Sequence, residues 1–473
     1  MRLYNTQKRN KEDFIPLLDK IVKMYVCGPT VYNYFHLGNA RPFITYDTLR
    51  RYLEYSGYTV TYVQNFTDID DKMIKKAQAE GVTISELADK YIDAYFYDAD
   101  RLNIRRADVH PRATETIPMI IELIGTLIAK NFAYEAADGI YFDVSRLPDY
   151  GKLSRHNLED LESGSRELAA EDGDKRNPLD FALWKKKKPD EPFWPSPWGD
   201  GRPGWHIECS AMVKQHLGDT IDIHGGGQDL VFPHHENEIA QSEAANGKPF
   251  VRYWLHNGFI NVDREKMSKS AGNFFTVRDL AQHYEYTVLR FFMLSSHYRM
   301  PINFSAELLE AAGQGWQRIC TCLEALHFVA SHAPEQAAGE GVKATETLNE
   351  AVRQSQDDFK AAMDDDLNTA DAIAAIFNLV RAANTAAAVE GIDAPVLRQA
   401  ASRLHAMLDV LGLSTKAADQ GKQVPAEVMS LVDERAEAKK TRDFARADAL
   451  REKVRQLGYA IEDTPQGPKV NAL

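Results

Sequence analysis

The chain has 473 residues, and at roughly 100–200 residues per domain it is expected to form several packed units. Hydrophobic residues make up 44% and charged residues 26% of it, which is typical of a globular protein and excludes an intrinsically disordered one. The formal net charge is −13, from 56 basic and 69 acidic residues, which excludes a uniformly basic nucleic-acid-binding protein. Any RNA partner must therefore meet a locally basic surface.

Cysteine content and the opening sequence indicate the cytoplasm. Four cysteines, at positions 27, 209, 320 and 322, are too few for the disulfide framework of a secreted protein, so reduced thiols or metal ligands are expected. Residues 1–14 are too polar for a signal peptide, and no apolar run reaches the roughly 18 residues that a membrane helix needs. We expect a cytoplasmic monomer that does not bind membranes, with Cys320 and Cys322 as ordinary helix residues.

The first 115 residues predict a strand, a helix and a second strand. Residues 20–26 have the pattern of a short buried strand, and a helical pattern covers residues 40–56 until Gly57 ends it. Residues 58–65 alternate and are rich in β-branched and aromatic side chains, as strands are. This order is that of a parallel βαβ crossover.

The next two segments predict an insertion followed by the second half of the same sheet. Residues 116–205 begin helically and continue as a polar, Pro- and Trp-rich stretch with little periodicity, which we interpret as an insertion. Residues 206–305 contain further strand patterns at 220–224 and 256–262. An open parallel sheet binds its ligands beyond the carboxyl ends of its strands.

The remaining chain predicts a helical bundle and a small last domain. Residues 306–413 are rich in Ala, Leu, Glu, Gln and Arg at helical spacing, with a loop at 331–344. A polar joint at 414–425 opens the last segment, residues 414–473, which is compact and charged.

Two short motifs carry the chemistry of phosphates. His36-Leu37-Gly38-Asn39 follows a strand and precedes a helix, where free N–H groups and the helix dipole favour a phosphate. Alone, a histidine in a loop is the commoner interpretation. Lys266-Met267-Ser268-Lys269-Ser270 offers two lysines that can neutralise charge on a leaving pyrophosphate, although a bare charge cluster is usually a solvated loop. In this order, the two motifs resemble the HIGH and KMSKS signatures of class I aminoacyl-tRNA synthetases.

A third constellation combines soft and hard metal ligands. His234 and Glu238 stand four apart and share one face of a helix, and Cys27 and Cys209 can complete a tetrahedral zinc site. Two buried apolar cysteines beside a polar helix remain an alternative.

Nearly the whole chain is similar to bacterial cysteinyl-tRNA synthetases. The resemblance runs through MYVCGPTVYNYFHLGNARPF, NFTDIDDKM, GWHIECSAM, DIHGGGQDLVFPHHENEIAQSE and EKMSKSAGNF. It implies a Rossmann-type parallel-sheet catalytic core with an insertion, a helical bundle and a small anticodon-binding domain. It also implies one zinc ion per chain, held by Cys27, Cys209, His234 and Glu238, that binds the thiol of the substrate directly.

The same resemblance implies the substrate-binding residues. His36, Asn39, Asp229, Lys266 and Lys269 are expected to bind ATP, which is accompanied by Mg²⁺, and Asp229 is expected at the ribose. Asn39 stands where the family has its last HIGH histidine, and an amide can donate to phosphate but cannot carry charge. Catalysis is expected from His36, Asn39, Lys266 and Lys269.

For cysteine, the resemblance implies contacts from Trp205 and Thr67. Four further histidines crowd the same region and either orient ligands or are structural: His206, His224, His235 and His256. Because sulfur chemistry separates cysteine from serine, no editing domain is needed, and the short insertion offers little room for one.

The last segment is the expected tRNA contact. Between residues 435 and 455 eight basic side chains stand against four acidic ones, which suits phosphate binding, although a solvated charged helix is the alternative. We expect Lys439, Lys440 and Arg442 to contact RNA. The predicted function is thus a cysteine–tRNA ligase that uses L-cysteine, ATP and tRNA(Cys).

Two rival functions share these motifs. One is a cysteine ligase that acts on a small aminosugar, as in mycothiol biosynthesis, but such an acceptor needs neither a helical bundle nor a basic tail. The other is a non-catalytic zinc- or RNA-binding paralogue, which should have lost one of the phosphate-handling motifs, whereas both are present here.

Overall fold

The structure is a computed structural model that describes residues 1–155, 175–262, 265–266, 275–413, 425–464 and 467–472. It divides into two compact units, one formed by residues 1–309 with 363–369 and the other by 310–362 with 370–473. In the described ranges, no helix is both long and apolar enough to cross a membrane.

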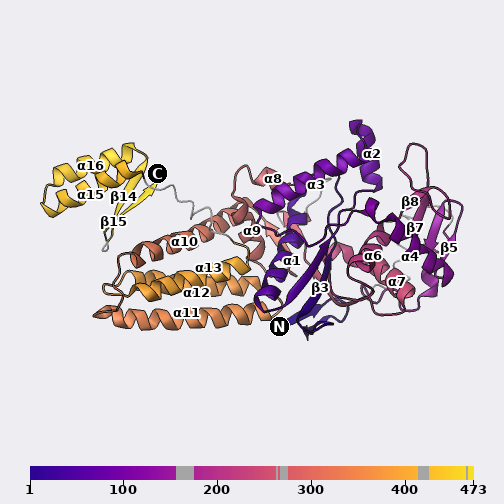
Figure 1. The fold of residues 1–473 in the computed structure, drawn as a ribbon, viewed down its shortest axis with the longest axis horizontal. Helices are drawn as coiled ribbons and strands as arrows, with labels where there is room; N and C mark the ends of the chain where they lie inside the picture. The colour runs from indigo at the N-terminus through magenta and orange to yellow at the C-terminus, as the bar shows by residue number, and fades with distance from the viewer. Residues whose placement is uncertain (156–174, 263–264, 267–274, 414–424, 465–466, 473) are drawn as a thin grey trace. The chain divides into compact units, whose positions relative to one another are not determined.

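The first unit is built on a four-stranded sheet in the order β10-β9-β3-β4, in which every pair is parallel. Figure 1 labels β3 of this sheet. Its strands are β3 (Ile21–Val26), β4 (Thr59–Gln64), β9 (Ile221–Gly227) and β10 (Val251–Asn257). Helix α1 (Leu37–Tyr55) connects β3 to β4, and α7 (Glu236–Asn246) lies between β9 and β10 in the chain. Strand β3 connects outwards to β4, and β9 connects outwards to β10 on the other side. The direction of the connections thus reverses between β3 and β9, and such folds bind ligands at this switch point. The predicted α/β fold class is confirmed.

Two predicted elements differ from the structure. Helix α1 begins at Leu37 and not at residue 40, because the His36 side chain caps it by accepting a hydrogen bond from Asn39 N. The strand predicted at 256–262 is wrong, since it is divided between β10 and β11 (Ile260–Val262), which lies in a different sheet. Gly258 makes the break: it donates to Tyr298 O, and a Cβ there would lie 2.7 Å from Arg299 O.

The insertion has more regular structure than its sequence suggested. Its four-stranded antiparallel sheet has the order β5-β6-β7-β8, and its strands are β5 (Ala133–Glu135), β6 (Gly139–Phe142), β7 (Phe181–Lys186) and β8 (Gly201–Pro203). Helix α4 (Ile117–Ala129) and α6 (Trp205–His216) share a hydrophobic core with this sheet, in which the Trp184 side chain is fully buried. The tryptophan-rich stretch therefore contributes β7, β8 and the Trp184 side chain to this core, while the residues between the two strands form a loop.

One short segment from much later in the chain belongs to the first unit. Residues 363–369 join it, and Asp366, which is fully buried, is their anchor. Its carboxylate accepts from Tyr4 N at 2.8 Å, from the Tyr298 hydroxyl at 2.8 Å and from Arg299 Nε at 2.7 Å. A single carboxylate thus joins the N-terminal strand to the segment around residue 298.

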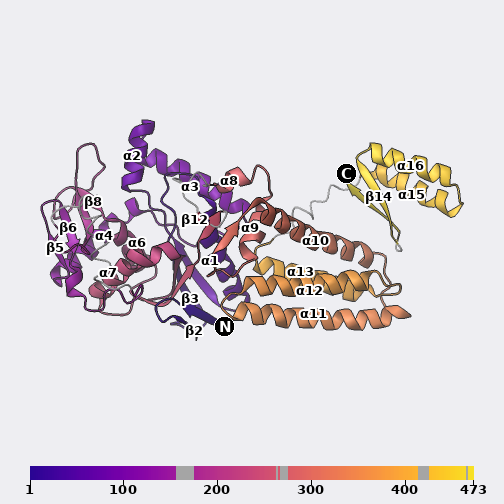
Figure 2. The ribbon, with the colours of Figure 1, turned by 180° about the vertical axis from the view of Figure 1, so that it is seen from behind.

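The second unit contains long helices and a small separate fold. Helices α10 (Ala306–Ala330), α11 (Glu340–Asp364), α12 (Thr369–Ala387) and α13 (Ala394–Val410) lie side by side in both views (Figures 1 and 2). The last residues form α15 (Ala426–Lys440), α16 (Phe444–Gln456) and the hairpin β14 (Tyr459–Thr464) and β15 (Gly467–Ala472) around a small core that includes Val432 and Val454. Cys320 and Cys322 are buried in α10, as expected, and most of the predicted joint at 414–425 lies outside the described residues.

The other helices and strands connect or flank these parts. They are β1 (Arg2–Asn5), β2 (Asn10–Asp13), α2 (Asp71–Glu80), α3 (Ile84–Arg101), η1 (Ala113–Glu115), η2 (Val144–Arg146), η4 (Gln228–Leu230), η5 (Val231–His235), β12 (Glu265–Lys266), α8 (Val277–Leu280), α9 (Tyr286–Leu294) and β13 (Ile302–Phe304).

Candidate active site and metal centre

A cavity of about 430 Å³ lies at the carboxyl ends of β3 and β9, where the two halves of the sheet diverge. It is lined by most of the side chains predicted from the sequence: Cys27, His36, Asn39, Thr67, Trp205, Cys209, Asp229 and His234. Residues that are up to about two hundred positions apart therefore meet in one cavity, although each of these roles stays a prediction.

The first metal-ligand candidate is delivered by a tight approach of two strands. Cys27 follows β3 directly, and its N–H donates to Gly225 O on β9 at 3.2 Å. The next residue, Gly28, donates to Asn65 Oδ1 at 2.8 Å, and a Cβ at Gly28 would lie 1.7 Å from Asn65 O. Only glycine permits this approach, which holds the Cys27 thiol at the end of the sheet.

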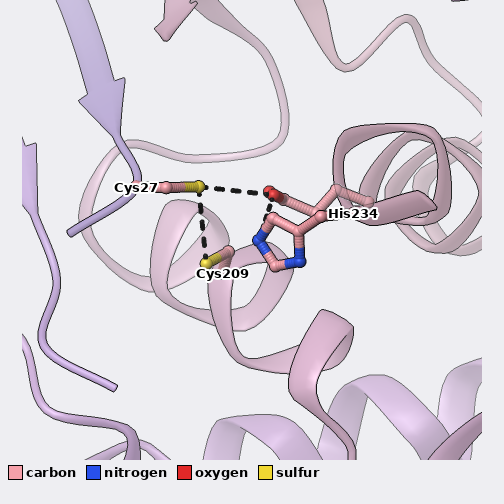
Figure 3. Close-up of side chains that lie close together, drawn as sticks. Cys27, Cys209 and His234 are labelled. Carbon is pink, nitrogen blue, oxygen red and sulfur yellow. Dashed lines mark hydrogen bonds and ion pairs between the residues drawn. The ribbon is translucent and has the colours of Figure 1, made fainter. Parts of the chain in front are cut away.

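The four predicted metal ligands converge (Figure 3). Their donor atoms all lie within 4.8 Å of one another. Cys27 Sγ is 3.9 Å from Cys209 Sγ, and His234 Nε2 is 3.0 Å from Glu238 Oε1. Neighbouring ligands of tetrahedral zinc stand about 3.3–3.8 Å apart, given bonds of about 2.0–2.3 Å, so the two distances lie within about 0.3 Å of this range on either side. Two sulfurs, an imidazole nitrogen and a carboxylate oxygen also match the chemistry of zinc, so these residues fit the metal.

A second group of donors shares two of these residues. Cys27, His224, His235 and Glu238 also lie within 4.8 Å of one another. The two groups differ in access, because Cys209 and His234 line the cavity whereas His224 and His235 do not. A substrate in the cavity could reach a metal bound by the first group. A metal bound by the second group would have two ligands that do not face the cavity. The first group therefore suits a substrate-binding metal.

The buried ionisable side chains of the first group of ligands favour a cation bound between them. Burial opposes ionisation of Glu238, but His224 and His234 outweigh it and lower the pKa of this carboxyl to about 2. The hydrogen bond from Cys27 lowers the pKa of Cys209 to about 6, while burial raises that of Cys27. Burial opposes protonation of His234, yet Glu238 and Cys209 raise its pKa to about 10. Two buried anions thus surround a position that favours positive charge.

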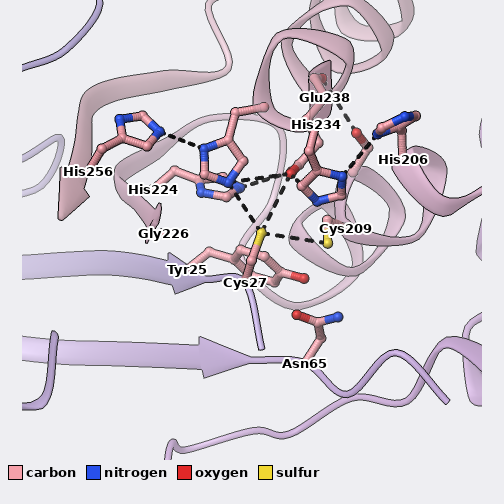
Figure 4. A network of polar contacts seen from close by, with 12 residues as sticks. Tyr25, Cys27, Asn65, His206, Cys209, His224, Gly226, His234, Glu238 and His256 are labelled. Carbon is pink, nitrogen blue, oxygen red and sulfur yellow. Dashed lines mark hydrogen bonds and ion pairs between the residues drawn. The ribbon is translucent and has the colours of Figure 1, made fainter. Parts of the chain in front are cut away.

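Outer histidines orient the candidate ligands (Figure 4). His206 Nδ1 is 2.9 Å from His234 Nδ1, which leaves Nε2 of His234 facing Glu238. His224 Nε2 is 2.9 Å from Glu238 Oε2, on the oxygen that does not face His234. His235 Nδ1 pairs with His256 Nε2 at 2.8 Å. Such outer contacts fix ring orientation and tautomer in metal sites.

The first phosphate motif makes backbone contacts with residues that follow the second motif in the chain. His36 Nδ1 accepts from Asn39 N at 3.2 Å, so a neutral His36 ring carries its proton on Nε2. Residue 36 also forms an antiparallel bridge with Thr276, and Leu37 N donates to Phe275 O at 3.1 Å. Residues 275 and 276 stand just after the KMSKS-like motif. Lys266 lies in β12, opposite Asn261 of β11, whereas Lys269 lies outside the described residues.

The predicted substrate contacts differ in how exposed they are. The Trp205 indole is 41% exposed and stacks on His234, with ring centroids 4.4 Å apart. Thr67 is buried, and its hydroxyl donates to Glu208 Oε2 at 3.2 Å. Asp229 is exposed beside the glycines that end β9. The cavity thus has an aromatic ring stacked on one of the candidate metal ligands and an exposed carboxylate in its lining.

Sequence reasoning missed two residues at this cavity. Lys72, in the first turn of α2, lines it and adds an ammonium group. Asn65 lines it as well, and its amide donates to Thr67 Oγ1 at 3.3 Å. The available signal was weak, since both stand in or beside NFTDIDDKM without a spacing that marks a site.

The three predicted tRNA contacts differ in their surroundings. Lys439 Nζ lies 2.8 Å from Asp463 Oδ2, in an ion pair that also includes the buried Arg435. Lys440 is 75% exposed, and only the equally exposed Glu437 is near it. Arg442 is exposed in the turn before α16, where its φ is 62°. Lys440 and Arg442 are therefore more available to a partner than Lys439 is.

Comparisons with known proteins bear on the fold first. A Mycobacterium tuberculosis methionyl-tRNA synthetase in complex with methionyl-adenylate has a TM-score of 0.62 at 17% identity, over 83% of this chain and 89% of that one. A LeuRS from Agrobacterium radiobacter in a ternary complex with tRNA has a TM-score of 0.61 at 11% identity, over 85% and 84%. A family model described as the tRNA synthetases class I (C) catalytic domain matches residues 13–314. The fold and the catalytic domain are those of a class I aminoacyl-tRNA synthetase.

More similar sequences define the family. Proteins named cysteine–tRNA ligase from Caldicellulosiruptor saccharolyticus and Clostridioides difficile are each 51% identical over 473 residues, and cover 99–100% of this chain and of their own. That from Symbiobacterium thermophilum is 52% identical over 470 residues, 99% of this chain and 98% of its own. A DALR domain model matches residues 358–415, and a cysteinyl-tRNA ligase anticodon binding domain model matches 422–469. The chain belongs to the cysteine–tRNA ligase family, which confirms the predicted resemblance.

Proposed function

We propose that this chain activates L-cysteine with ATP to cysteinyl-adenylate and then transfers the cysteinyl group to the 3′-terminal adenosine of tRNA(Cys). One observation supports this most directly: a single cavity contains a sulfur-rich metal-ligand group at one end and the His36 and Asn39 motif elsewhere on its wall. A thiol bound at the first end and a phosphate at the second would belong to two substrates that must react with each other. We place the reaction in the cytoplasm and propose a monomer.

We assign one zinc ion per chain to Cys27, Cys209, His234 and Glu238. The donor types given above fit zinc, and Cys27, Cys209 and His234 of this group all line the cavity. When bound there, zinc would offer the substrate thiol a soft ligand-binding position that the hydroxyl of serine cannot match. His206 contacts the His234 ring, and His224 contacts the Glu238 carboxylate, so both ligands are held in place. Selection by sulfur explains how such a site can work without editing.

The chain's own residues would bind and orient the two substrates. Trp205 and Thr67 flank the metal end and would contact cysteine, with Asn65 and Glu208 holding the Thr67 hydroxyl. The cysteine carboxylate would then attack the α-phosphate of ATP, and pyrophosphate would leave as the bond to the β-phosphate breaks.

Nucleotide binding would use the phosphate motifs. The Nε2–H of His36 and the amide of Asn39 are suited to donate to phosphate oxygens, and Asp229 to accept from the ribose hydroxyls. Lys266 and Lys269, with Mg²⁺ that accompanies ATP, would neutralise the negative charge that develops on the phosphates. In the second step a ribose hydroxyl of the tRNA, the 2′-OH by class I resemblance, attacks the activated carbonyl and AMP leaves.

The small last fold would bind the tRNA. Beside the exposed Lys440, the Phe444 ring at the start of α16 is 61% exposed. An exposed aromatic ring next to basic side chains is the combination on which unpaired RNA bases stack while their phosphates are neutralised. We propose that this turn, residues 440–444, contacts the anticodon loop.

The test is an ATP–pyrophosphate exchange assay across the protein amino acids, followed by transfer assays. Exchange should depend on cysteine alone and proceed without tRNA. Transfer should then occur to tRNA(Cys) and not to a small aminosugar. Exchange that serine supports as well as cysteine does would contradict the sulfur-selective site, and preferred transfer to the aminosugar would favour the rival ligase.

A further inference from the structure

Arg41 is a buried arginine whose hydrogen bonds all go to main-chain carbonyl oxygens. It lies in α1, five residues after His36, and is 1% exposed. Its Nη1 donates to Gly258 O at 2.8 Å and to Phe259 O at 2.7 Å. Its Nη2 donates to His297 O at 3.2 Å and to Met300 O. Burial lowers the pKa of Arg41 to about 9, which still leaves the guanidinium charged at neutral pH.

The carbonyls belong to two segments, one of which lines the cavity. Asn257, Gly258, Phe259 and Ile260 line the cavity at the end of β10. The other segment, residues 297–300, is held tightly against Gly258, since Gly258 N donates to Tyr298 O at 2.9 Å and a Cβ there would lie 2.7–2.8 Å from the backbone of residues 299 and 300. Arg41 thus joins the helix that His36 caps to both segments at once.

These segments also lead to the second phosphate motif. The segment that follows β10 continues into β11, and the segment 297–300 continues into β13. Strands β11 and β13 pair in parallel. On its opposite edge β11 pairs with β12, and Lys266 lies opposite Asn261. A movement of the segment under Arg41 would therefore shift the strand that carries Lys266 relative to the helix that begins after His36.

We infer that Arg41 is a positioning residue for ATP, which sets the spacing between the His36 helix and the strands that lead to Lys266. This rests on the proposed function, because it assumes that the nucleotide lies between the two motifs. The planar guanidinium fork reaches four acceptors in two segments simultaneously, which the single ammonium of lysine cannot do. Small misplacements of substrate-binding groups have large kinetic effects, up to about a hundredfold for about 1 Å.

The test compares Arg41→Lys with Arg290→Lys. Arg290 is the matched control, since it is also fully buried and also contacts α1, through Asp47 and Thr48. Its carbonyl acceptors, Leu102 and Asn103, do not line the cavity. Zinc content, the midpoint of thermal unfolding, the dissociation constant of ATP, and kcat and KM in cysteine-dependent exchange are measured for both variants and for the parent.

Arg41→Lys should raise both the dissociation constant and the KM for ATP and lower kcat, by about tenfold or more in kcat/KM. The KM for cysteine and the zinc content should not change, and Arg290→Lys should lose thermal stability without this kinetic pattern. Gly258→Ala should reproduce the pattern, because its methyl group would push apart the same two segments. The inference is overturned if Arg41→Lys and Arg290→Lys behave alike at equal thermal stability. A parent that binds ATP but lacks cysteine-dependent exchange would contradict the proposed function, while the ATP dissociation constants would still test the role of Arg41.

Discussion

At the scale of single residues, the two thiols of the cavity are the most sensitive positions. Cys209 is 2% exposed, with Cys27 Sγ at 3.9 Å. Replacing one sulfur by oxygen removes a soft ligand without changing the size of the side chain much, so any loss of metal reports the ligand chemistry and not the packing.

We expect Cys209→Ser to lose most of its zinc and to discriminate poorly against serine in the exchange assay. Cys322→Ser is the matched control, because Cys322 is equally buried but lies in α10, with its thiol directed at Val380 O. Metal analysis of both purified variants decides the matter. Full zinc and unchanged discrimination in Cys209→Ser would remove this residue from the metal site.

The sequence was informative about residues whose chemistry is marked by type and spacing. The pair His234 and Glu238, four apart, was predicted to share a face, and the structure brings their donor atoms to 3.0 Å, although α7 begins only at Glu236. It could not reveal Arg41 or Asn65, because their roles depend on backbone segments that are distant in the chain and meet only after folding.

At the scale of the elements, the turn between α15 and α16 separates structural from available charges. Lys439 already neutralises Asp463, whereas Lys440 has only a surface ion pair, a contact that contributes little. Fewer basic side chains in this region are therefore available to contact RNA than the count of basic residues in the sequence suggests.

We expect the double variant Lys440→Gln with Arg442→Gln to weaken tRNA binding and to reduce its salt dependence by up to about two counterions. Lys439→Gln, the control, should chiefly destabilise the small fold and change the salt dependence less. Affinities measured over a series of salt concentrations test this. A larger loss in Lys439→Gln than in the double variant would reverse the assignment.

The segment after α3 contains a half-buried histidine that should make stability depend on pH. His110 Nδ1 lies 2.9 Å from Gln64 O, and its Nε2 accepts from Ala107 N at 3.0 Å, so only the neutral ring fits. Burial, followed by the charges of Arg106 and Arg50, lowers the pKa of His110 to about 4. The unfolded chain, with a pKa of about 6.5, binds the proton first.

Stability from His110 is therefore complete above about pH 6.5 and is lost as the pH falls towards 4, by at most about 1.4 kcal/mol per pH unit. We expect His110→Asn to flatten this part of the pH profile of thermal unfolding, and His332→Asn, at an exposed histidine, to leave it unchanged. Parallel profiles for the parent and His110→Asn would contradict the assignment.

Elements with a clear period were predicted well, and those defined by tertiary contacts were not. Strands β3 and β4 followed from their buried and alternating residues, and both lie within one residue of their predicted ends. The division of residues 256–262 between two sheets depends on the close contact of Gly258 with residues 299 and 300, which no local pattern records.

At the scale of the whole molecule, cysteine activation and tRNA binding should be separable. All residues proposed for adenylate formation lie before residue 305, and the small fold lies after residue 424. We expect deletion of residues 414–473 to leave cysteine-dependent exchange nearly unchanged and to reduce aminoacylation of tRNA(Cys) by about tenfold or more. Parallel exchange and aminoacylation assays on the truncated chain measure both. Undiminished aminoacylation would contradict the proposed role of the small fold.

Asp366 sets a limit on where the chain can be divided. This buried carboxylate accepts hydrogen bonds from Tyr4 N, the Tyr298 hydroxyl and the Arg299 guanidinium. A fragment that ends at residue 309 lacks Asp366, so these three donors would lose their acceptor. The catalytic unit is thus discontinuous in sequence, and the turn at residues 363–369 is supplied from beyond the first helix of the bundle. A chain split between residues 331 and 339 should consequently reassemble from its two pieces, since the second piece carries the carboxylate that completes the first.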